Sequence, residues 1–380
     1  MDDIQDLSNK SILLNASNLH VGGGVQVAVS IISELSNFDS LPDNLTIWVS
    51  SEVFENLSAL NIDVCCFPNF RVVDCYGLKM AFSGFANELA KFDAVYTVFG
   101  PLYVFHKPRV SIVGFAQGLL IYPNIFKKSA LLRIIDFLRF RIQLFFWKKS
   151  DALVVELDHV KNQLENFSPL GKKRMHVIPN CLSSIYAEPD CWEDVQILMP
   201  RADIHLGVVG RNYDHKNTAV LPVVKSILKA RYGLDVAIYV TFTDAEWCEC
   251  SAEFRQSIIN VGALRVGQCP IFYRKMYGVL FPSLLECFSA TPLEAMAMGK
   301  PLFASDRMFN RDICGDYAFY FDPLDAVSIA KSVSDYYCAE SSFRSDMIDR
   351  AKRYAFDFSS PQERARMSLI LLESSIGSKA

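Results

Sequence analysis

Residues 281–306 read FPSLLECFSATPLEAMAMGKPLFASD, and this stretch predicts a strand, a loop, a helix and a second strand. The apolar residues before Pro282 form the first strand, and proline ends it. Thr291 as the N-cap and Pro292 at the first helical position open the helix. A Gly-Lys-Pro tripeptide closes the helix before the second strand at 302–304. The pattern is typical of an α/β protein.

Two glutamates flank the loop within this stretch. Glu286 follows the carboxyl end of the first strand, where α/β folds bind ligands. Glu294 lies three residues after Thr291, near backbone N–H groups that suit a phosphate. Carboxylates on both sides of the loop could hold hydroxyl groups. Two plainer interpretations stay open: Glu294 completes a capping box with Thr291, and Glu286 is a surface residue.

The same stretch resembles the signature of family 4 of the retaining glycosyltransferases, a Glu-x7-Glu pair followed by Ala-Met-Ala-x-Gly-x-Pro. Cys287 and Ser289 stand where that family usually has glycine. The resemblance covers residues 150–330 well and residues 10–120 loosely. It implies the GT-B fold, in which two Rossmann-like domains face each other across a cleft.

The resemblance also implies roles for residues of this stretch. Glu286 would be catalytic, holding the donor sugar, and Glu294 would hold the nucleotide ribose. The residues that would contact the donor between them are Phe288, Ser289, Ala290 and Thr291.

Length and composition limit the class of protein. A chain of 380 residues, 51% hydrophobic and 21% charged, predicts a folded protein of two domains. A net charge of −4 gives no electrostatic case for a nucleic-acid partner. The eleven cysteines are scattered, and the acidic first residues lack the apolar core of a secretion signal. No apolar run is long enough to span a membrane, so we expect a cytoplasmic protein with reduced thiols.

Short apolar runs alternate with helical segments along the chain, which favours mostly parallel sheets covered by helices. The first domain is expected at residues 1–179, completed by a terminal helix at 362–380 that crosses back in similar proteins, and the second domain at 180–361. Strands of the first are expected at 11–15, 45–49, 64–67, 72–75, 94–99, 110–115 and 152–156. Strands of the second are expected at 204–209, 236–240, 258–261, 278–281, 301–304 and 318–321.

A glycine-rich turn, residues 22–24, lies between the first strand and the first helix. Glycine lets backbone approach an anion or a sugar closely, although a plain tight turn is an alternative. A dinucleotide site would need a third glycine and a downstream acid, so a nicotinamide oxidoreductase fits poorly. The resemblance places Gly23 and Gly24 beneath the donor phosphates and beside the acceptor.

Residues 210–217, GRNYDHKN, follow the first strand of the second domain. Arg211 and Lys216 could clamp a diphosphate there, the arginine as a fork and the lysine as a point charge. A solvated loop is the alternative interpretation. In the family that the chain resembles, Gly-Arg-x4-Lys at this position is the diphosphate clamp, and we carry that role onto these two residues.

Two further features bear on the chemistry. Many relatives place a histidine after the strand at 110–115, but this chain has Gln117 and Gly118, so we assign Gln117 to the acceptor side and no catalytic histidine. The sequence also contains no Asp-x-Asp pair to hold a metal ion. We therefore expect Arg211 and Lys216 to neutralise the leaving diphosphate, with no metal and no cofactor.

Residues 126–149 interleave seven basic residues and six aromatic residues with a single acid, Asp136. This composition suits an anionic membrane surface, and here the inner membrane is the expected partner. A helix that packs on the first domain with a basic outer face is the alternative.

The sequence thus predicts a retaining hexosyltransferase that uses a nucleotide-diphosphate sugar as donor and a glycan or lipid-linked oligosaccharide as acceptor. Family resemblance alone suggests lipopolysaccharide, O-antigen or capsule assembly as its setting, peripheral on the inner face of the cytoplasmic membrane. The alternative is a non-catalytic or regulatory nucleotide-sugar-binding protein, which the substitutions at Cys287, Ser289 and Gly118 favour.

Overall fold

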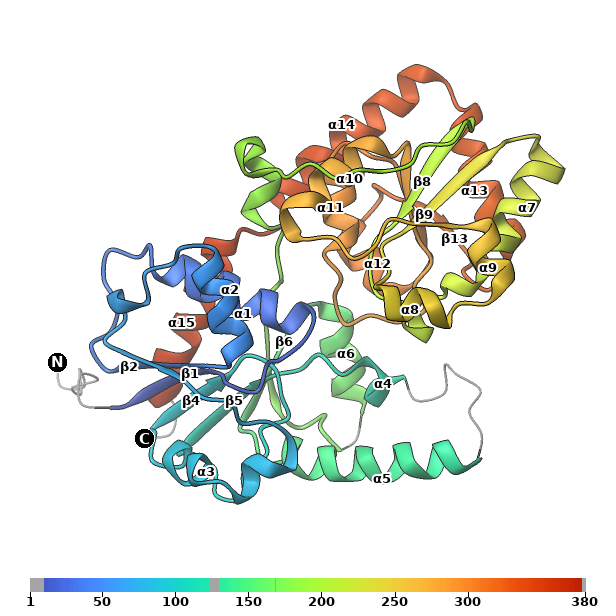
Figure 1. The fold of residues 1–380 in the computed structure, drawn as a ribbon. Coiled ribbons are helices and arrows are strands. Elements are labelled where there is room, and N and C mark those ends of the chain that lie inside the picture. Colours follow the sequence, from blue (N-terminus) through green and yellow to red (C-terminus); the bar gives the residue numbers. More distant parts are fainter. Residues whose placement is uncertain (1–9, 123–129, 168, 378–380) are drawn as a thin grey trace. The chain divides into compact units, whose positions relative to one another are not determined.

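The computed structural model describes residues 10–122, 130–167 and 169–377. The chain divides into two compact units (Figure 1). Unit 1 contains the chain up to Asn180 and again from Pro361, and unit 2 is Cys181–Ser360. The chain therefore passes between the units twice, and unit 1 is built from segments at both ends of the sequence.

Within the described residues, unit 1 contains a seven-stranded sheet in the order β3-β2-β1-β4-β5-β6-β7, with every neighbouring pair parallel. The inner strand β1 is buried at every position, as expected when helices cover both faces. Its one polar residue, Asn15, donates to Thr97 Oγ1 at 3.2 Å and accepts from Ser17 Oγ at 2.7 Å. The strands are β1 (Ile12–Ala16), β2 (Leu45–Val49), β3 (Asn69–Val72), β4 (Ala94–Thr97), β5 (Val110–Gly114), β6 (Ala152–Val155) and β7 (Arg174–Val177).

Helices α1 and α15 pack against each other, and α15 also contacts β1, β4 and β5. The helix from the end of the chain therefore completes unit 1. The α-helices of unit 1 are α1 (Gly23–Leu35), α2 (Ser51–Ala59), α3 (Gly84–Leu89), α4 (Gly118–Ile121), α5 (Ala130–Trp147), α6 (Asp158–Asn166) and α15 (Pro361–Gly377), and its 3-10 helices are η2 (Val64–Cys66) and η3 (Gly77–Phe82).

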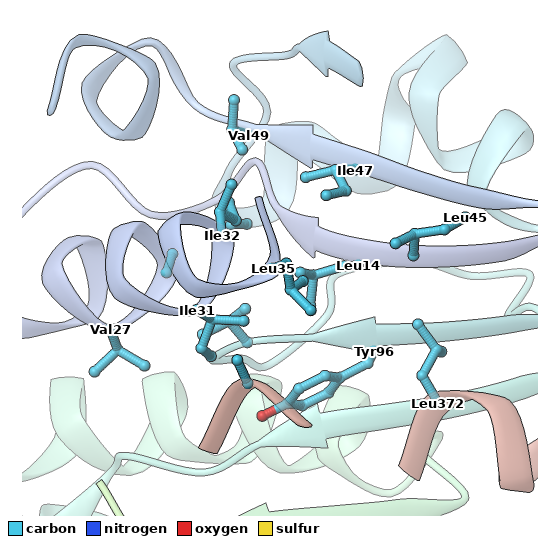
Figure 2. Packing of buried hydrophobic residues seen from close by; sticks show 14 of the residues in the cluster. Leu14, Val27, Ile31, Ile32, Leu35, Leu45, Ile47, Val49, Tyr96 and Leu372 are labelled. Atoms are coloured by element: carbon cyan, nitrogen blue, oxygen red, sulfur yellow. The ribbon is translucent and has the colours of Figure 1, made fainter. Parts of the chain in front are cut away.

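One hydrophobic cluster joins the sheet to α1, α2 and α15 (Figure 2). Ile31 and Ile32 of α1 lie against the sheet, and Leu372 of α15 lies beside Tyr96 of β4. Each of these side chains is buried to 4% exposure or less. Full burial of one such side chain stabilises the fold by about 1.5–3 kcal/mol, so α15 is part of the core and not an appendage.

Unit 2 contains, among the described residues, a six-stranded sheet in the order β10-β9-β8-β11-β12-β13, again parallel throughout. Its strands are β8 (Ile204–Val208), β9 (Val236–Val240), β10 (Ile259–Asn260), β11 (Gly278–Phe281), β12 (Leu302–Ser305) and β13 (Phe319–Phe321). Its helices are α7 (Leu221–Tyr232), α8 (Asp244–Glu249), α9 (Ala252–Ser257), α10 (Cys269–Lys275), α11 (Thr291–Ala297), α12 (Met308–Cys314), α13 (Ala326–Cys338) and α14 (Ser341–Asp357). The 3-10 helices are η4 (Ser184–Ala187), η5 (Pro189–Cys191), η6 (Asp214–Lys216), η7 (Thr218–Val220) and η8 (Val266–Gln268).

Both sheets reverse their strand order at one position. In unit 1 the reversal lies between β1 and β4, and in unit 2 it lies between β8 and β11. At such a position the two connections leave toward opposite faces of the sheet and open a space beyond the carboxyl ends of the strands. Ligand sites are therefore expected after β1 and β4 in unit 1, and after β8 and β11 in unit 2.

The expected α/β fold class is confirmed, but the expected strands at 64–67 and 72–75 are wrong in detail. Val64–Cys66 is a 3-10 turn, because Asp63 accepts the backbone N–H of Cys65 at 2.9 Å and bends the chain. The third strand of the unit is Asn69–Val72 instead. Val73 and Cys75 are buried beyond its end, which explains why their hydrophobicity indicated a strand.

A buried polar cluster joins β6 to the two points where the chain passes between the units. Glu156 follows β6, Arg364 lies in the first turn of α15, and Asn180 is the last residue before the first passage. Arg364 donates to Asn180 Oδ1, and Asn180 also hydrogen-bonds to Glu156. Burial raises the pKa of Glu156 to about 7, against the opposing effects of Arg364 and Asn180.

This raised pKa predicts a pH-dependent stability. Between pH 4.5 and 7 the folded chain holds a proton on Glu156 that the unfolded chain has released, so stability falls as pH rises. Glu156→Gln mimics the protonated acid and cannot titrate, so its stability lacks this contribution to the pH dependence. We expect the free energy of unfolding of the wild type, relative to the variant, to fall by on the order of 3 kcal/mol across this interval. Urea unfolding of both proteins from pH 4.5 to pH 7 measures the difference; parallel curves would contradict the prediction.

Candidate functional site

The carboxyl edge of the unit 2 sheet brings together the two loops that the sequence singled out. Strands β8 and β11 are neighbours, so the loops that follow them leave the sheet side by side. The backbone N–H of Leu284 donates to the carbonyl of His215 at 2.7 Å and ties the loops together. Gly210, Arg211, Lys216 and Ser283 line a small hollow between them. The hollow lies where the strand order reverses.

Lys216 and Glu286 form an ion pair in this place. Lys216 Nζ lies 2.6 Å from Glu286 Oε1, and the side chains are only 16% and 11% exposed. Lys216 Nζ also lies 5.2 Å from the ring centroid of Phe281. Because both groups are largely removed from water, their mutual attraction is stronger than that of a surface pair. An entering anion would compete with Glu286 for this lysine.

His215 completes the polar surface around Glu286. Its Nε2 lies 3.9 Å from Glu286 Oε1, and its ring stacks on Tyr213. Burial and the neighbouring Lys216 lower the pKa of His215, and Glu286 acts in the opposite direction. The imidazole is therefore neutral at physiological pH, which suits a hydrogen-bonding role better than a charged one.

Arg211, the second predicted cation, is held by a residue of α8. Its Nε donates to Glu246 Oε1 at 2.7 Å, and the arginine side chain is 51% exposed. Glu246 was not anticipated as part of this site. The Thr-x-x-Glu pattern at 243–246 could have identified it as a capping glutamate, but no feature of the sequence linked it to Arg211.

Glu294 is partly buried beside two tyrosine hydroxyls. Tyr273 donates to Glu294 Oε2 at 2.7 Å, and Tyr186 hydrogen-bonds to the same carboxylate. Burial raises the pKa of Glu294, while these hydrogen bonds act in the opposite direction. Neither tyrosine was anticipated, because Tyr186 and Tyr273 lie far from Glu294 in sequence.

The expected start of α11 is wrong. Ala290 is the N-cap, no side chain caps the helix, and Thr291 is its first helical residue. The capping-box interpretation of Glu294 fails for the same reason, because its carboxylate contacts Tyr273 instead of the helix start. Thr291 hydrogen-bonds to Tyr273, so it still belongs to the polar network around Glu294.

The remaining residues predicted to contact the donor have less distinctive positions in unit 2. Phe288 is partly buried, with its ring 6.4 Å from that of Phe358. Ser289 and Ala290 are also partly buried and lead into α11.

Three predicted residues belong to unit 1. Gly23 and Gly24 open α1 after Gly22, whose φ of 71° favours glycine. A Cβ on Gly24 would lie 3.3 Å from Leu19, so the turn is tightly packed there, whereas Gly23 faces open space. Gln117 is the N-cap of α4 and is partly buried. These residues follow β1 and β5 at the carboxyl edge of their own sheet.

Helix α5 carries an exposed apolar surface, which we call the α5 surface. Ile134, Leu138, Ile142 and Phe145 repeat at helical spacing and are all exposed, Leu138 to 56%. Gln143 and Trp147 on the opposite face are buried. Four basic side chains of this segment are described, Arg139, Arg141, Lys148 and Lys149, whereas residues 126–129 of the predicted segment lie outside the described residues.

The α5 surface continues onto neighbouring loops. Phe82, at the end of η3, is 80% exposed and contacts Phe105 edge to face at 5.4 Å. Lys149 Nζ lies 4.9 Å from the ring centroid of Phe145 and donates to the carbonyl of Phe105 at 2.7 Å. The result is a continuous exposed aromatic and aliphatic area with cations at its edge.

Two searches were restricted to the described parts of the chain. There, no helix is both long enough and apolar enough to cross a membrane. In the same residues, no three His, Cys, Asp or Glu side chains are grouped so that they could hold a metal ion.

Comparison with solved structures identifies the fold. The two parallel-sheet units are the GT-B fold, which solved glycosyltransferases share. The glycosyltransferase WaaG, described as involved in lipopolysaccharide biosynthesis, superposes with a TM-score of 0.64 at 12% identity over 95% of this chain and 99% of its own. Anabaena Alr3699/HepE in complex with UDP-glucose gives a TM-score of 0.62 at 13% identity over 97% and 98% of the two chains.

Sequence comparison finds similarity to glycosyltransferases over part of the chain. Residues 206–354, which contain Arg211, Lys216, Glu286 and Glu294, match the family model described as glycosyl transferases group 1. The O-antigen chain mannosyltransferase RfbU of Salmonella typhimurium is 24% identical over 129 residues. That alignment covers 33% of this chain and 36% of the length of RfbU.

Proposed function

We propose that this protein is a retaining glycosyltransferase that transfers a hexosyl unit from a nucleotide-diphosphate sugar to a glycan or lipid-linked oligosaccharide. The observation that carries the proposal is the pairing of Lys216 with Glu286 at the strand-order reversal of unit 2, 2.6 Å apart. The match of residues 206–354 to group 1 glycosyltransferases supports it. The likeness to RfbU and WaaG supports a setting in lipopolysaccharide or related surface-polysaccharide assembly.

In this proposal each charged group has a separate task. Lys216 and Arg211 bind the diphosphate and stabilise the negative charge that develops as it leaves. Glu286 holds the donor sugar, and Glu294, held by Tyr273, binds the ribose hydroxyls. The departing phosphate takes the proton of the attacking acceptor hydroxyl on the same face of the sugar. Gly23, Gly24 and Gln117 of unit 1 serve the donor phosphates and the acceptor.

The test measures release of nucleoside diphosphate from UDP-glucose and GDP-mannose with glycan and lipid-linked acceptors present. Glu286→Gln should lower kcat by about 100-fold, because its contact strengthens as the bond to the diphosphate breaks. Glu294→Gln should chiefly raise the donor KM, because it binds ground state and transition state alike. The reverse pattern would exchange these roles.

Donor binding without release of nucleoside diphosphate would favour the alternative, a non-catalytic nucleotide-sugar-binding protein, which the substitutions at Cys287 and Ser289 favour.

Metal independence follows from the two cations. Because Arg211 and Lys216 supply the positive charge at the diphosphate, transfer should continue in the presence of excess EDTA. Initial rates with and without the chelator provide the comparison. Loss of activity in EDTA that Mn²⁺ or Mg²⁺ restores would refute this part of the proposal.

The α5 surface suits a membrane that presents a lipid-linked acceptor. Its exposed apolar stripe can enter the boundary between headgroups and acyl chains, and its cations complement anionic headgroups. In this proposal the protein is cytoplasmic and peripheral on the inner face of the membrane. An anionic bilayer is favoured over an apolar protein partner because the stripe is bordered by Arg139, Arg141 and Lys148.

Vesicle binding tests this surface. The protein should sediment with vesicles that contain phosphatidylglycerol, and salt should release it. Replacing Arg139 and Arg141 by glutamine should weaken binding about 30-fold, since each contributes on the order of 1 kcal/mol. Leu138→Ser with Phe145→Ser should weaken it as well, because these side chains would enter the bilayer. Phe343→Ser with Phe356→Ser, exposed phenylalanines of α14, is the matched control and should change nothing. Equal binding by all variants would show that the α5 surface does not bind the membrane.

A further inference from the structure

Glu246 is the centre of a small hydrogen-bond network beside the hollow in unit 2. Its Oε1 accepts from Arg211 Nε at 2.7 Å and from the backbone N–H of Asn212 at 3.1 Å. Its Oε2 accepts from the backbone N–H and the hydroxyl of Thr243 at 2.9 and 3.0 Å. One oxygen therefore serves the start of α8, and the other serves the loop after β8. The glutamate side chain is 13% exposed.

The contact with Arg211 uses one particular nitrogen. The guanidinium is planar, so a hydrogen bond to Nε fixes its plane and leaves both terminal amino groups available for an anion. Without this contact, a half-exposed arginine would sample many rotamers. Glu246 can fix Arg211 because Thr243 and Asn212 already hold the carboxylate in place.

Charge considerations agree with this arrangement. Burial would raise the pKa of Glu246, but the hydrogen bonds from Thr243, Arg211 and Asn212 outweigh it and lower the pKa. Glu246 is therefore ionised at neutral pH and accepts a charge-assisted bond. The negative charge of Glu246 also reduces the attraction of Arg211 for an anion. If Glu246 orients Arg211, removing its charge should weaken anion binding. If Glu246 mainly neutralises Arg211, removing its charge should strengthen anion binding.

We infer that Glu246 is a positioning residue, which holds the Arg211 fork in the orientation that grips the diphosphate of the donor. The inference rests on the proposed function, because the ligand of Arg211 is the donor diphosphate. Glu246 touches neither donor nor acceptor in this account and acts only through Arg211.

Calorimetric titration with pyrophosphate, UDP and GDP tests the inference. Glu246→Gln keeps a side chain that can complete the capping box, so α8 is preserved. It loses the charge-assisted bond that immobilises Arg211, and the affinity for the best of these ligands should fall about 2- to 10-fold. Glu249→Gln, an exposed glutamate on the same helix, is the matched control and should bind like the wild type. Unchanged or tighter binding by Glu246→Gln overturns the inference.

A double-variant comparison separates positioning from a general structural effect. If Glu246 acts through Arg211, the affinity of Arg211→Ala should be the same with and without Glu246→Gln. If the affinity losses of the two single variants multiply in the double variant, Glu246 acts independently of Arg211, and the inference is wrong. Arg211→Lys provides a second test that does not depend on folding of a Glu246 variant. It keeps the charge but lacks the fork that Glu246 orients, so it should bind more weakly than the wild type, and wild-type affinity would overturn the inference.

Failure of the proposed function has a different signature. If the wild type binds none of pyrophosphate, UDP and GDP, the diphosphate site itself is refuted, and the inference falls with it. If the wild type binds and only the Glu246 comparison fails, the proposed function stands and the role of Glu246 is rejected.

Discussion

Parallel pairing of β8 with β11 is the constraint on which the candidate site depends. The loops that follow two parallel neighbouring strands begin at the same edge of the sheet. The pairing of β8 with β11 therefore places Lys216 and Glu286 close together, although they are 70 positions apart in sequence. The hydrogen bond from Leu284 to His215 then fixes the two loops against each other. Lys216 and Glu286 can form a largely buried ion pair because rigid strands carry both loops.

The limits of sequence-based prediction follow from the range of the interactions. Val236–Val240 and Gly278–Phe281 were predicted to the residue, because strands buried on both faces read as continuous apolar runs. Local motifs predict the site residues Arg211, Lys216, Glu286 and Glu294, and the structure brings Lys216 and Glu286 into contact.

What the sequence could not supply were the partners that hold these residues. Tyr273 and Glu246 lie on helices whose placement depends on tertiary packing, and no periodicity reveals which carboxylate a buried tyrosine will meet. At Thr291, in contrast, a local pattern predicts an N-cap that the structure does not have. Its local pattern was a sound helix start, yet Glu294 is hydrogen-bonded to Tyr273 and the helix begins without a side-chain cap. Tertiary hydrogen bonds outweighed a local preference of about 1 kcal/mol.

The discontinuity of unit 1 determines the order in which the chain can fold during synthesis. Ala365, Leu372 and Ile376 of α15 belong to the same hydrophobic cluster as β1, β2 and α1. The N-terminal segment therefore leaves the ribosome with one side of its core uncovered, while Cys181–Ser360 can close its own core first. The half of the protein that is made first is completed last, and until α15 arrives its exposed strands and helices are open to chaperones and to aggregation.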